Sequence, residues 1–580
     1  MKKTTVIFAA LLFFLLPLKF GGLAVMPESG GFYPENYLDW LFITFPPHAI
    51  GFAGAILLLM AAISYREKLD FRQLIFTVSW SILPSLAVLP GIIRGDAVIA
   101  LGELSLLLGC GAIIAAASLI LNQEPDRAML LTGAIFFGGI VTACYGWNQH
   151  LYSLDEMRNF VAEQEAKGIP VSEGMRLKLT DPRIYSTLAS SNTLASLLMI
   201  MSVMGVYFSG YWSRMITPPR QAKYIMRILF LLLFVSVLLL TRSRSMIFCP
   251  VIAGVLALFS TGKIKWKWRL AGLVAGVILL IAGIIVAAAA GRGVASMGER
   301  ADYLRTSTVL CAEYPLTGSG WGGFFRTHMK IKFSDVQETA RDPHNVVALF
   351  ASQCGIPAGL IMLWVLLCPL IFLWKHRFEK NLCGAVFWCG VIFTLHSLID
   401  CDWQIPALIV IMGVLYTAAL AQLPEKKYAK IPSWVITAAA IIISVGAWAT
   451  TLWYIAGDVA ITNLQDKVNP ASLEMAQKYE AYPVEFLAEK AKKYRPDQAV
   501  IPIFCGDWYF RLGDLDRAEN FFREAEKLDP ARPSTYMRLA RISMLRGKRE
   551  EAQKYLDHAG KLFPKSNKYT MEKLCKELKI

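Results

Sequence analysis

The stretch that decides the fold class, residues 223–261, reads KYIMRILFLLLFVSVLLLTRSRSMIFCPVIAGVLALFST. It holds two apolar runs, each close to the roughly twenty residues that cross a hydrocarbon core of about 30 Å, and only Thr241-Arg242-Ser243-Arg244 separates them. Such runs recur along the 580 residues, of which 55% are hydrophobic, and the mean hydropathy is +0.45. This composition excludes an ordinary soluble globule. Because lipid leaves backbone groups no partner outside a helix, we predict an all-α polytopic membrane protein.

Apolar runs along the whole chain predict about 13 transmembrane helices. The first could instead be a signal peptide, although the residues that follow it, Leu23 to Met26, lack a clean small-residue cleavage site. The predicted spans cover approximately 5–25, 46–64, 74–94, 97–121, 128–148, 186–211, 223–241, 244–261, 268–290, 346–374, 381–399, 404–422 and 432–454.

The distribution of Lys and Arg predicts the orientation of these helices. Both residue types are denser in alternate loops, and the positive-inside rule assigns those loops to the cytoplasm. The N-terminus is then inside, whereas the long loops 149–185 and 291–345 and everything after Trp453 lie outside. Orientation explains the net charge of +15, so we expect the lipid bilayer, and no nucleic acid, as a partner. The cytoplasmic loops are those around 65–73, 122–127, 212–222, 262–267, 375–380 and 423–431.

The eleven cysteines fall singly, and none has metal-ligand spacing. Most lie inside apolar runs, as do Cys110, Cys144, Cys249, Cys368 and Cys389. We therefore predict packing roles for them, with no metal site and no cofactor.

The charged segment after the last apolar run repeats with a period of 34 residues. Pro496, Pro530 and Pro564 are spaced by this interval, and so are Gly513 and Gly547. This period, with a mid-repeat glycine and a closing proline, resembles the tetratricopeptide repeat (TPR), a helix–turn–helix unit that stacks on its neighbours. Such a small soluble α-helical domain could be a spacer, add stability, or bind a partner protein or a glycan. Two units, 497–530 and 531–564, match well, and a third at 463–496 is degenerate.

Arg242 and Arg244 stand where the membrane pattern disfavours charge. Their turn is so short that both lie at the predicted outer boundary, against the positive-inside trend. A guanidinium can bind phosphate oxygens through two hydrogen bonds at once, and ionisable groups at membrane depth are functional candidates. The alternative is that both side chains extend to lipid headgroups or pair with an acidic neighbour such as Asp400.

The outer loop 291–345 carries further candidates. Arg300 lies in its first part, and His344-Asn345 stands at the mouth of the tenth span. Histidine titrates near neutral pH and can act as a general base, so His344 is the candidate base. A histidine at a helix start is, however, often a capping or interface residue.

Two aspartates follow the eleventh span on the same predicted side. Asp400 and Asp402 could orient His344, balance the arginines or bind a cation. Charge balance is the simplest of the three, because no other carboxylates stand at metal-ligand spacing.

The order of these motifs resembles the O-antigen ligase and polymerase superfamily. Leu304 stands where the family usually has an aromatic residue, with Tyr303 beside it, so Arg305 is an alternative to Arg300. The resemblance runs from about 181 to 422 through Arg183-Ile184-Tyr185-Ser186-Thr187, Ser191-Asn192-Thr193-Leu194-Ala195, Thr241-Arg242-Ser243-Arg244, Arg300 with Pro315-Leu316-Thr317-Gly318-Ser319-Gly320, His344-Asn345 with Gly355-Ile356-Pro357, and His396 through Pro406.

The resemblance implies a membrane glycosyltransferase that uses an undecaprenyl-diphosphate-linked glycan as donor. Arg242 or Arg244, together with Arg300, would hold the diphosphate, and His344 would take a proton from the acceptor hydroxyl. The implied location is the bacterial inner membrane, with the site and the C-terminal domain in the periplasm. Supporting residues would be Arg183, Asn192, Asn345, Asp400 and Asp402.

Several activities share these motifs. They are ligation of a glycan onto lipid A core, polymerisation of repeat units, and transfer to Ser or Thr of a protein. The motif arrangement favours a ligase-like enzyme over a polymerase, and the acceptor stays open. A lipid-linked glycan transporter and a non-catalytic assembly scaffold are the other classes. The predicted domains are 1–180 (N-terminal helices), 181–422 (ligase-like core with loop 291–345), 423–462 (last span and linker) and 463–580 (TPR-like repeats, with a possible protein partner).

Overall fold

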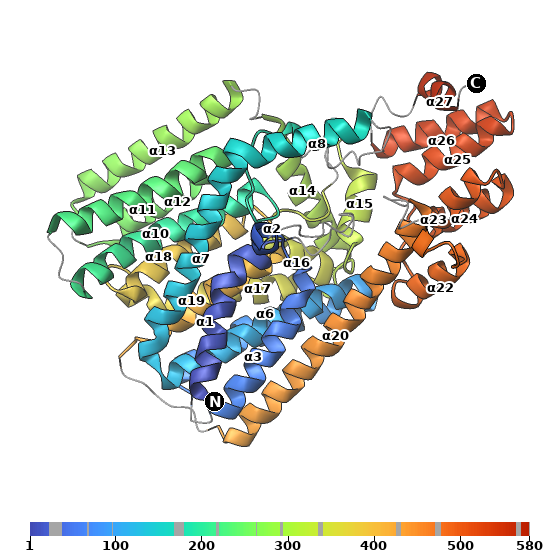
Figure 1. The fold of residues 1–580 in the computed structure, drawn as a ribbon. Coiled ribbons are helices and arrows are strands. Elements are labelled where there is room, and N and C mark those ends of the chain that lie inside the picture. The colour runs from blue at the N-terminus through green and yellow to red at the C-terminus, as the bar shows by residue number, and fades with distance from the viewer. Residues whose placement is uncertain are drawn as a thin grey trace.

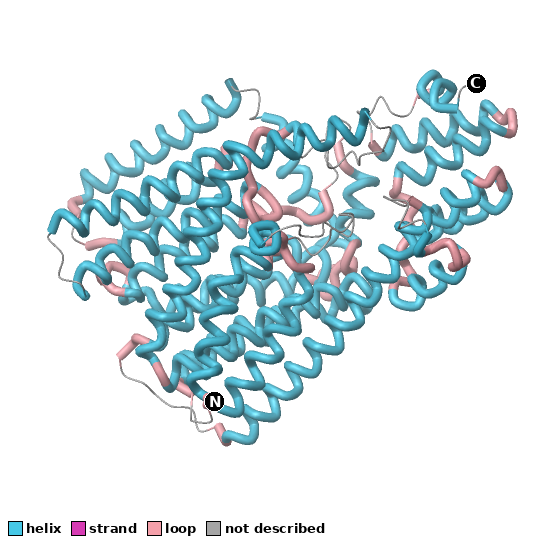
Figure 2. Tube along the Cα trace, viewed as in Figure 1, coloured by secondary structure: helices cyan, strands magenta, loops and turns pink. Residues whose placement is uncertain are grey.

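The structure is a computed structural model, and its described residues form helices joined by loops (Figure 2). No strand occurs among those residues, which confirms the all-α fold class for them. The described chain excludes residues 23–36, 66–68, 95–96, 167–178, 216–219, 263, 290–293, 334–339, 425–430, 470–476, 564–569 and 579–580.

Figure 1 shows how the helices of the body are arranged, and its described residues form nineteen α-helices. Its first part contains α1 (Lys2–Lys19), α2 (Tyr37–Phe42), α3 (Ile50–Ser64), α4 (Phe71–Thr77), α5 (Leu83–Arg94), α6 (Ala97–Gln123), α7 (Ala128–Asn148), α8 (Leu154–Ala166) and α10 (Ser191–Met215). Its second part contains α11 (Arg220–Thr241), α12 (Ser245–Ser260), α13 (Trp266–Ala289), α14 (Val294–Glu313), α15 (Gly323–Ile331), α16 (Val346–Cys354), α17 (Ile356–Leu373), α18 (Leu382–Ser397), α19 (Pro406–Ala421) and α20 (Ser433–Val468), and α22 (Val484–Tyr494) begins the C-terminal part.

Eight described helical segments are long and apolar enough to cross a membrane, which supports an integral membrane protein. The shorter apolar helices α12, α18 and α19 coincide with three more predicted spans, and α1 and α13 coincide with the remaining two. A full set of 13 crossings stays a prediction. The eight segments are Pro47–Ser64, Phe71–Arg94, Ile99–Gln123, Pro125–Glu163, Ser191–Ser213, Gln221–Thr241, Ile356–His376 and Ser433–Val468.

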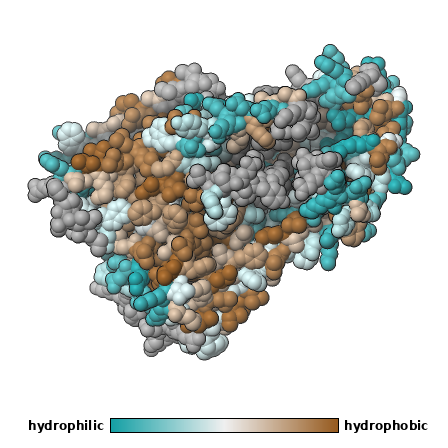
Figure 3. Space-filling model, viewed as in Figure 1, coloured by the Kyte–Doolittle hydropathy of each residue, from teal (hydrophilic) through white to brown (hydrophobic). Residues whose placement is uncertain are grey.

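The centre of the body is occupied by α19 and α6. Every residue of α19 is buried, and so is most of α6, as expected of helices that are apolar all round. In contrast, α11 and α20 leave most of their apolar residues partly or fully exposed, and Leu229 and Leu232 are among the exposed ones. Figure 3 shows this apolar surface over the helical body and a polar surface over the C-terminal part. An exposed apolar surface of this kind fits contact with lipid.

The tenth predicted span, 346–374, is wrong as a single helix. It is divided at Gly355 into α16 and α17. Gly355 has a φ of 97°, and a Cβ at this position would lie 2.2 Å from the carbonyl oxygen of Leu316. The backbone N–H of Ile356 donates to the oxygen of Pro315 at 2.8 Å. The break therefore makes room for the glycine-containing turn of the preceding loop, which only a residue without a side chain permits here.

The C-terminal helices come after α20 in the chain, and the 36 residues of α20 span about 54 Å, which is longer than a bilayer core. Two helix pairs fall within the predicted repeat units, and the glycines between paired helices, Gly513 and Gly547, have φ values of 80° and 73°. The TPR identity itself stays a prediction, and Pro564 lies outside the described residues. These helices are α23 (Val500–Arg511), α24 (Leu515–Leu528), α25 (Pro533–Leu545), α26 (Arg549–Leu562) and α27 (Met571–Leu578).

The short helix α15 joins the long loop 291–345 to the C-terminal domain (Figure 1). Met329 belongs to the same buried apolar cluster as Leu487 of α22, and Phe325 packs against this cluster. One position earlier in each case, Phe324 and His328 are buried on the neighbouring face of the helix. The two i, i+4 pairs give α15 one face toward the C-terminal domain and another toward the loop interior.

Candidate functional site

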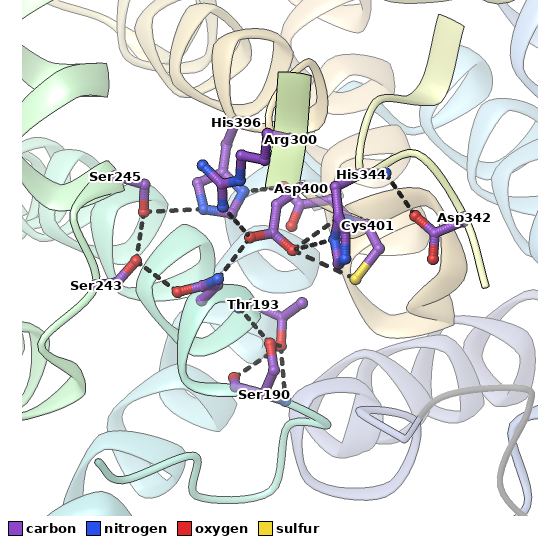
Figure 4. Close-up of polar contacts among 12 residues, drawn as sticks. Ser190, Thr193, Ser243, Ser245, Arg300, Asp342, His344, His396, Asp400 and Cys401 are labelled. Atoms are coloured by element: carbon purple, nitrogen blue, oxygen red, sulfur yellow. Dashed lines mark hydrogen bonds and ion pairs between the residues drawn. The ribbon is translucent and has the colours of Figure 1, made fainter. Parts of the chain in front are cut away.

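Asp400, in the loop between α18 and α19, is the point where several candidate residues meet (Figure 4). Its carboxylate is 3% exposed; Oδ2 lies 3.6 Å from Nη2 of Arg300, and Oδ1 lies 3.7 Å from Nδ1 of His344. Asn192 of α10 donates its amide N–H to Oδ2 at 2.7 Å, and the backbone N–H of Cys401 donates to Oδ1 at 2.9 Å. Residues separated by up to 208 positions in the chain thus converge on one carboxylate.

The surroundings of Asp400 keep its carboxylate ionised. Burial alone would raise its pKa, but the contact and the positive charge of His344 oppose this effect, with a further contribution from the charge of His396. The pKa of Asp400 is consequently held well below its usual range. A permanent negative charge next to Arg300 and His344 can fix the orientation of both side chains.

His344 occupies a strained backbone position. Among the described residues, the non-glycine residues with positive φ are Ser186 (52°), Arg242 (50°) and His344 (51°). The left-handed region costs a residue with a Cβ about 1 kcal/mol, and such strain clusters at functional sites. All three fall in motifs that carry the resemblance to the O-antigen ligase superfamily, which marks these motifs as candidates for function.

The local contacts of His344 explain how the strain is held. Its backbone N–H donates to Oδ1 of Asp342 at 2.7 Å. Asn345 caps α16 by accepting from the N–H of Ala348 at 3.0 Å, and its amide donates to the backbone oxygen of Leu398 at 2.9 Å. Asn345, predicted as a supporting residue, therefore ties the start of α16 to the loop that carries Asp400.

The ring of His344 rests near an aromatic cluster. Its centroid lies 5.7 Å from that of Tyr303, whose ring meets His328 edge to face at 5.2 Å. Tyr303 is buried, whereas Leu304 is exposed. Tyr303, one helical turn after Arg300 on α14, is thus the aromatic residue next to the His344 ring.

Arg305, the alternative to Arg300, has different partners in the structure. Its guanidinium donates to Oδ1 of Asp302, at 2.9 and 2.7 Å, and to the backbone oxygen of Ile331. Asp302 is fully buried and also accepts from the backbone N–H of Phe333. Arg305 therefore connects α14 with the end of α15. Arg300 is the arginine next to Asp400.

The other candidate arginines differ in their surroundings. Arg244 is partly buried and interacts electrostatically with Arg300 and Arg183, and also with the acidic Glu299. Arg183 is also paired with Asp181, with Nη2 to Oδ2 at 2.6 Å. Arg242 is exposed, and its side chain has no ion pair or hydrogen bond with the described residues. A cluster of partly buried cations is a suitable binding site for a polyanion.

Asp402, predicted as a supporting residue, does not contact His344 or the arginines through its hydrogen bonds. It accepts from Ser196 at 2.8 Å and lies 2.8 Å from Nδ1 of His396, and both members of the His396–Asp402 pair are completely buried. His396 begins the motif that ends at Pro406, but the sequence alone assigns no role to it. A histidine followed within six residues by two aspartates, at the end of an apolar run, is the signal that could have indicated it.

Three residues at the site could in principle offer metal ligands. One ligand atom each from His344, Asp400 and Cys401 lies within 4.8 Å of the others. The Cys401 thiol, however, donates to Oδ1 of Asp400 at 3.3 Å, and burial together with nearby carboxylates raises its pKa well above the usual range. A thiolate ligand is therefore disfavoured here, and Arg300 already balances the carboxylate.

Part of the chain is similar to a known family. Residues 228–363 match the O-antigen ligase family model. The match supports the O-antigen ligase superfamily and a membrane glycosyltransferase-like role in polysaccharide or lipopolysaccharide biosynthesis. It includes Arg242, Arg244, Arg300 and His344, and ends before Asp400. In the C-terminal domain, residues 492–561 match a family of unknown function, and no curated protein matches the chain.

Proposed function

We propose that the protein transfers a glycan from an undecaprenyl-diphosphate-linked donor to an acceptor hydroxyl, as an O-antigen ligase-like membrane glycosyltransferase. The observation that carries this proposal is the placement of Arg300 and His344 on opposite oxygens of the buried Asp400 carboxylate. A cation for the leaving diphosphate and a base for the acceptor are thereby held side by side. The family match over the segment that contains both residues supports the same assignment.

The proposed reaction needs one bond formed and one broken. The acceptor oxygen forms a bond to the anomeric carbon of the glycan, while the bond from that carbon to the diphosphate oxygen breaks. The electron pair leaves with undecaprenyl diphosphate, and the acceptor proton goes to His344. Because negative charge grows on the leaving diphosphate, fixed cations lower the barrier.

Each residue then has a distinct proposed role. Arg300 and Arg244 bind the diphosphate, with Arg183 contributing positive charge to the same cluster. Asp400 faces Nδ1 of His344, so it favours a proton on Nδ1 and leaves Nε2 to act as the base. Arg242, which is exposed, is the weaker candidate for diphosphate binding.

The side of the membrane is part of the proposal. The positive-inside distribution supports an outer, periplasmic location for the loop 291–345 in the bacterial inner membrane. The shared apolar cluster of α15 and the C-terminal helices supports the same side for the C-terminal domain. The domain would then brace the loop that carries the site.

A transporter is the competing class, and one observation bears on it. Transporter sites are often formed by discontinuous helices, and the break at Gly355 is a feature of that kind. The break is filled by the turn of the preceding loop, however, through the contact between Ile356 and Pro315. This packing favours a role in seating the loop over a role in opening a pathway.

The test is transfer by the purified full-length protein in nanodiscs, with an undecaprenyl-diphosphate-linked glycan as donor. Three acceptors are offered separately: lipid A core, a second lipid-linked glycan, and a peptide rich in Ser and Thr. We expect transfer to lipid A core, whereas transfer to another acceptor would assign a polymerase or a protein O-oligosaccharyltransferase. Movement of the lipid-linked glycan across sealed vesicles without transfer to any acceptor would contradict the proposal.

A further inference from the structure

A chain of hydrogen bonds connects Asp400 with His396, a histidine for which the proposed reaction has no use (Figure 4). Asn192 donates to Asp400 at 2.7 Å, and Ser243 donates to the amide oxygen of Asn192 at 2.9 Å. The hydroxyl oxygens of Ser243 and Ser245 lie 2.8 Å apart, and that of Ser245 lies 3.0 Å from Nε2 of His396. We call Ser243 and Ser245 the serine relay; both are buried.

The number of available protons determines which group donates and which accepts in each of these hydrogen bonds. An ionised Asp400 can only accept, so the NH₂ group of Asn192 faces it and the amide oxygen faces Ser243. Ser243 has one hydroxyl proton and donates it to that oxygen. Ser245 must then donate to Ser243, and the oxygen of Ser245 must accept from a proton on Nε2 of His396.

The same count of donors and acceptors determines how many protons the His396–Asp402 pair holds. With Nε2 protonated, a second proton must lie between Nδ1 and the Asp402 oxygen, which are 2.8 Å apart, because two acceptors would otherwise face each other. The pair carries no net charge whichever atom holds that proton. A fully buried pair without net charge avoids the large cost of burying a single ion.

We infer that the His396–Asp402 pair is a positioning device for Asp400. The pair donates into the serine relay, and the relay fixes the amide of Asn192. The amide in turn fixes the carboxylate that Arg300 and His344 share. This inference rests on the proposed function for its kinetic test, and a second, chemical test does not depend on that function.

The kinetic test uses Ser245→Ala, which breaks the relay without changing any residue that faces Arg300 or His344. We expect a fall in kcat of about tenfold with little change in the KM for the lipid-linked donor, because the reacting groups lose alignment while the cations stay. Ser245→Thr keeps the hydroxyl and is expected to restore most of the rate. Ser118→Ala is the matched control, because Ser118 is a buried hydroxyl with a partner, Thr77, on another part of the body.

A double variant separates positioning from a general loss of packing. Ser243→Ala and Ser245→Ala interrupt the same chain, so the double variant is expected to be no slower than the slower single variant. If the fold-losses in kcat of the two single variants multiplied in the double variant, the inference would be overturned. An equal loss of kcat in Ser118→Ala would also overturn it. A fall in thermal stability parallel to the fall in rate would overturn it as well.

The chemical test follows Cys401, whose thiol donates to Asp400 and whose pKa is raised by burial and by the neighbouring carboxylates. Release of Asp400 should lower that pKa and speed alkylation, since the thiolate is the reactive form. The rate of N-ethylmaleimide addition at Cys401 is read by mass spectrometry on the full-length protein. We expect a several-fold increase in Ser245→Ala and none in Ser118→Ala; equal rates would overturn the inference even if the wild-type protein transferred no glycan.

Discussion

Nδ1 of His344 and the side chain of Arg300 lie on opposite oxygens of one buried carboxylate, at 3.7 and 3.6 Å from Asp400. The proposed base and the proposed diphosphate-binding cation are therefore oriented by the same residue. A change at Asp400 should affect the proton transfer and the leaving group together, whereas a change at either partner should affect one of them.

Replacing Asp400 with Asn tests this shared role. A carboxylate stabilises the protonated form of a neighbouring imidazole, so Asp400→Asn should move the acid limb of the kcat/KM profile to lower pH. The maximum should also fall, by about tenfold or more, because His344 and Arg300 lose their common partner. The measurement is initial transfer rate against pH. Asp342→Asn is the control, because an amide oxygen can still accept from the N–H of His344.

The sign of the pH dependence follows from the Asp400 pKa. Because the folded protein holds that pKa below the ordinary value of 3.8, the ion pairs of Asp400 stabilise the fold above this pH and are lost as the pH falls through the lower folded pKa. Asp400 itself should thus remain ionised throughout the working range. An acid limb unchanged in Asp400→Asn would contradict the contact with His344 as the cause of that limb.

The two arginines of the short turn should be separable. Arg244 shares a cluster with Arg300 and Arg183, whereas Arg242 is exposed, so Arg244→Lys should weaken donor binding by about tenfold through loss of the planar fork. Arg242→Lys should change it by less than about twofold. Binding of undecaprenyl diphosphate in nanodiscs is the measurement. The opposite ranking would assign the diphosphate to Arg242.

The contact of α15 with the C-terminal domain should matter for activity. Met329→Asp places a charge in the shared apolar cluster and should loosen the domain from the loop, at a cost of about 2–3 kcal/mol. Lys332, whose Nζ lies 4.9 Å from the ring centroid of Phe563, is a second contact between the two parts. Lys330→Asp is the control, since Lys330 is exposed on the same helix.

Limited proteolysis and transfer rate would be measured together for these α15 variants. We expect Met329→Asp to increase cleavage between the domains and to lower kcat, and Lys330→Asp to do neither. Normal transfer in a Met329→Asp protein whose domain is released would instead support a spacer role for the C-terminal helices.

Metal removal should leave the reaction intact. The thiol of Cys401 donates to Asp400, and Arg300 balances that carboxylate, so the proposed transfer uses no metal. Excess EDTA should therefore leave the rate within about twofold, and Cys401→Ser, which keeps a donor, should do the same. Loss of activity in EDTA with recovery on adding Zn²⁺ or Mg²⁺ would contradict this account.

Hydropathy and motif order predicted much of this architecture because both are local properties. Apolar length places the helices, and the glycine and proline period places the C-terminal helix pairs. The division at Gly355 was missed because the surrounding residues are continuously apolar, and only the close approach of Leu316 makes the break necessary. Such contacts come from residues that are distant in the sequence and close only in the packed structure.

Part of the candidate site could be predicted for the same reason. Arginines and a histidine in apolar surroundings stand out in any sequence, so His344, Arg300 and Asp400 could be named in advance. Ser243 and Ser245 could not, because buried serines are common in membrane helices and their role depends on direction and spacing in three dimensions. Asp400 and Asp402 are only two residues apart, but Asp400 binds Asn192 and Asp402 binds His396. This difference in partners could likewise not be predicted without the geometry of the loop.

The most direct measurement is single-turnover transfer by His344→Ala and His344→Gln, alongside equilibrium binding of the undecaprenyl-diphosphate-linked donor. If His344 is the base, both variants should bind the donor within about twofold of wild type and transfer the glycan at least about 100-fold more slowly. Full transfer activity in either variant, with the protein folded and the donor bound, would contradict the central claim.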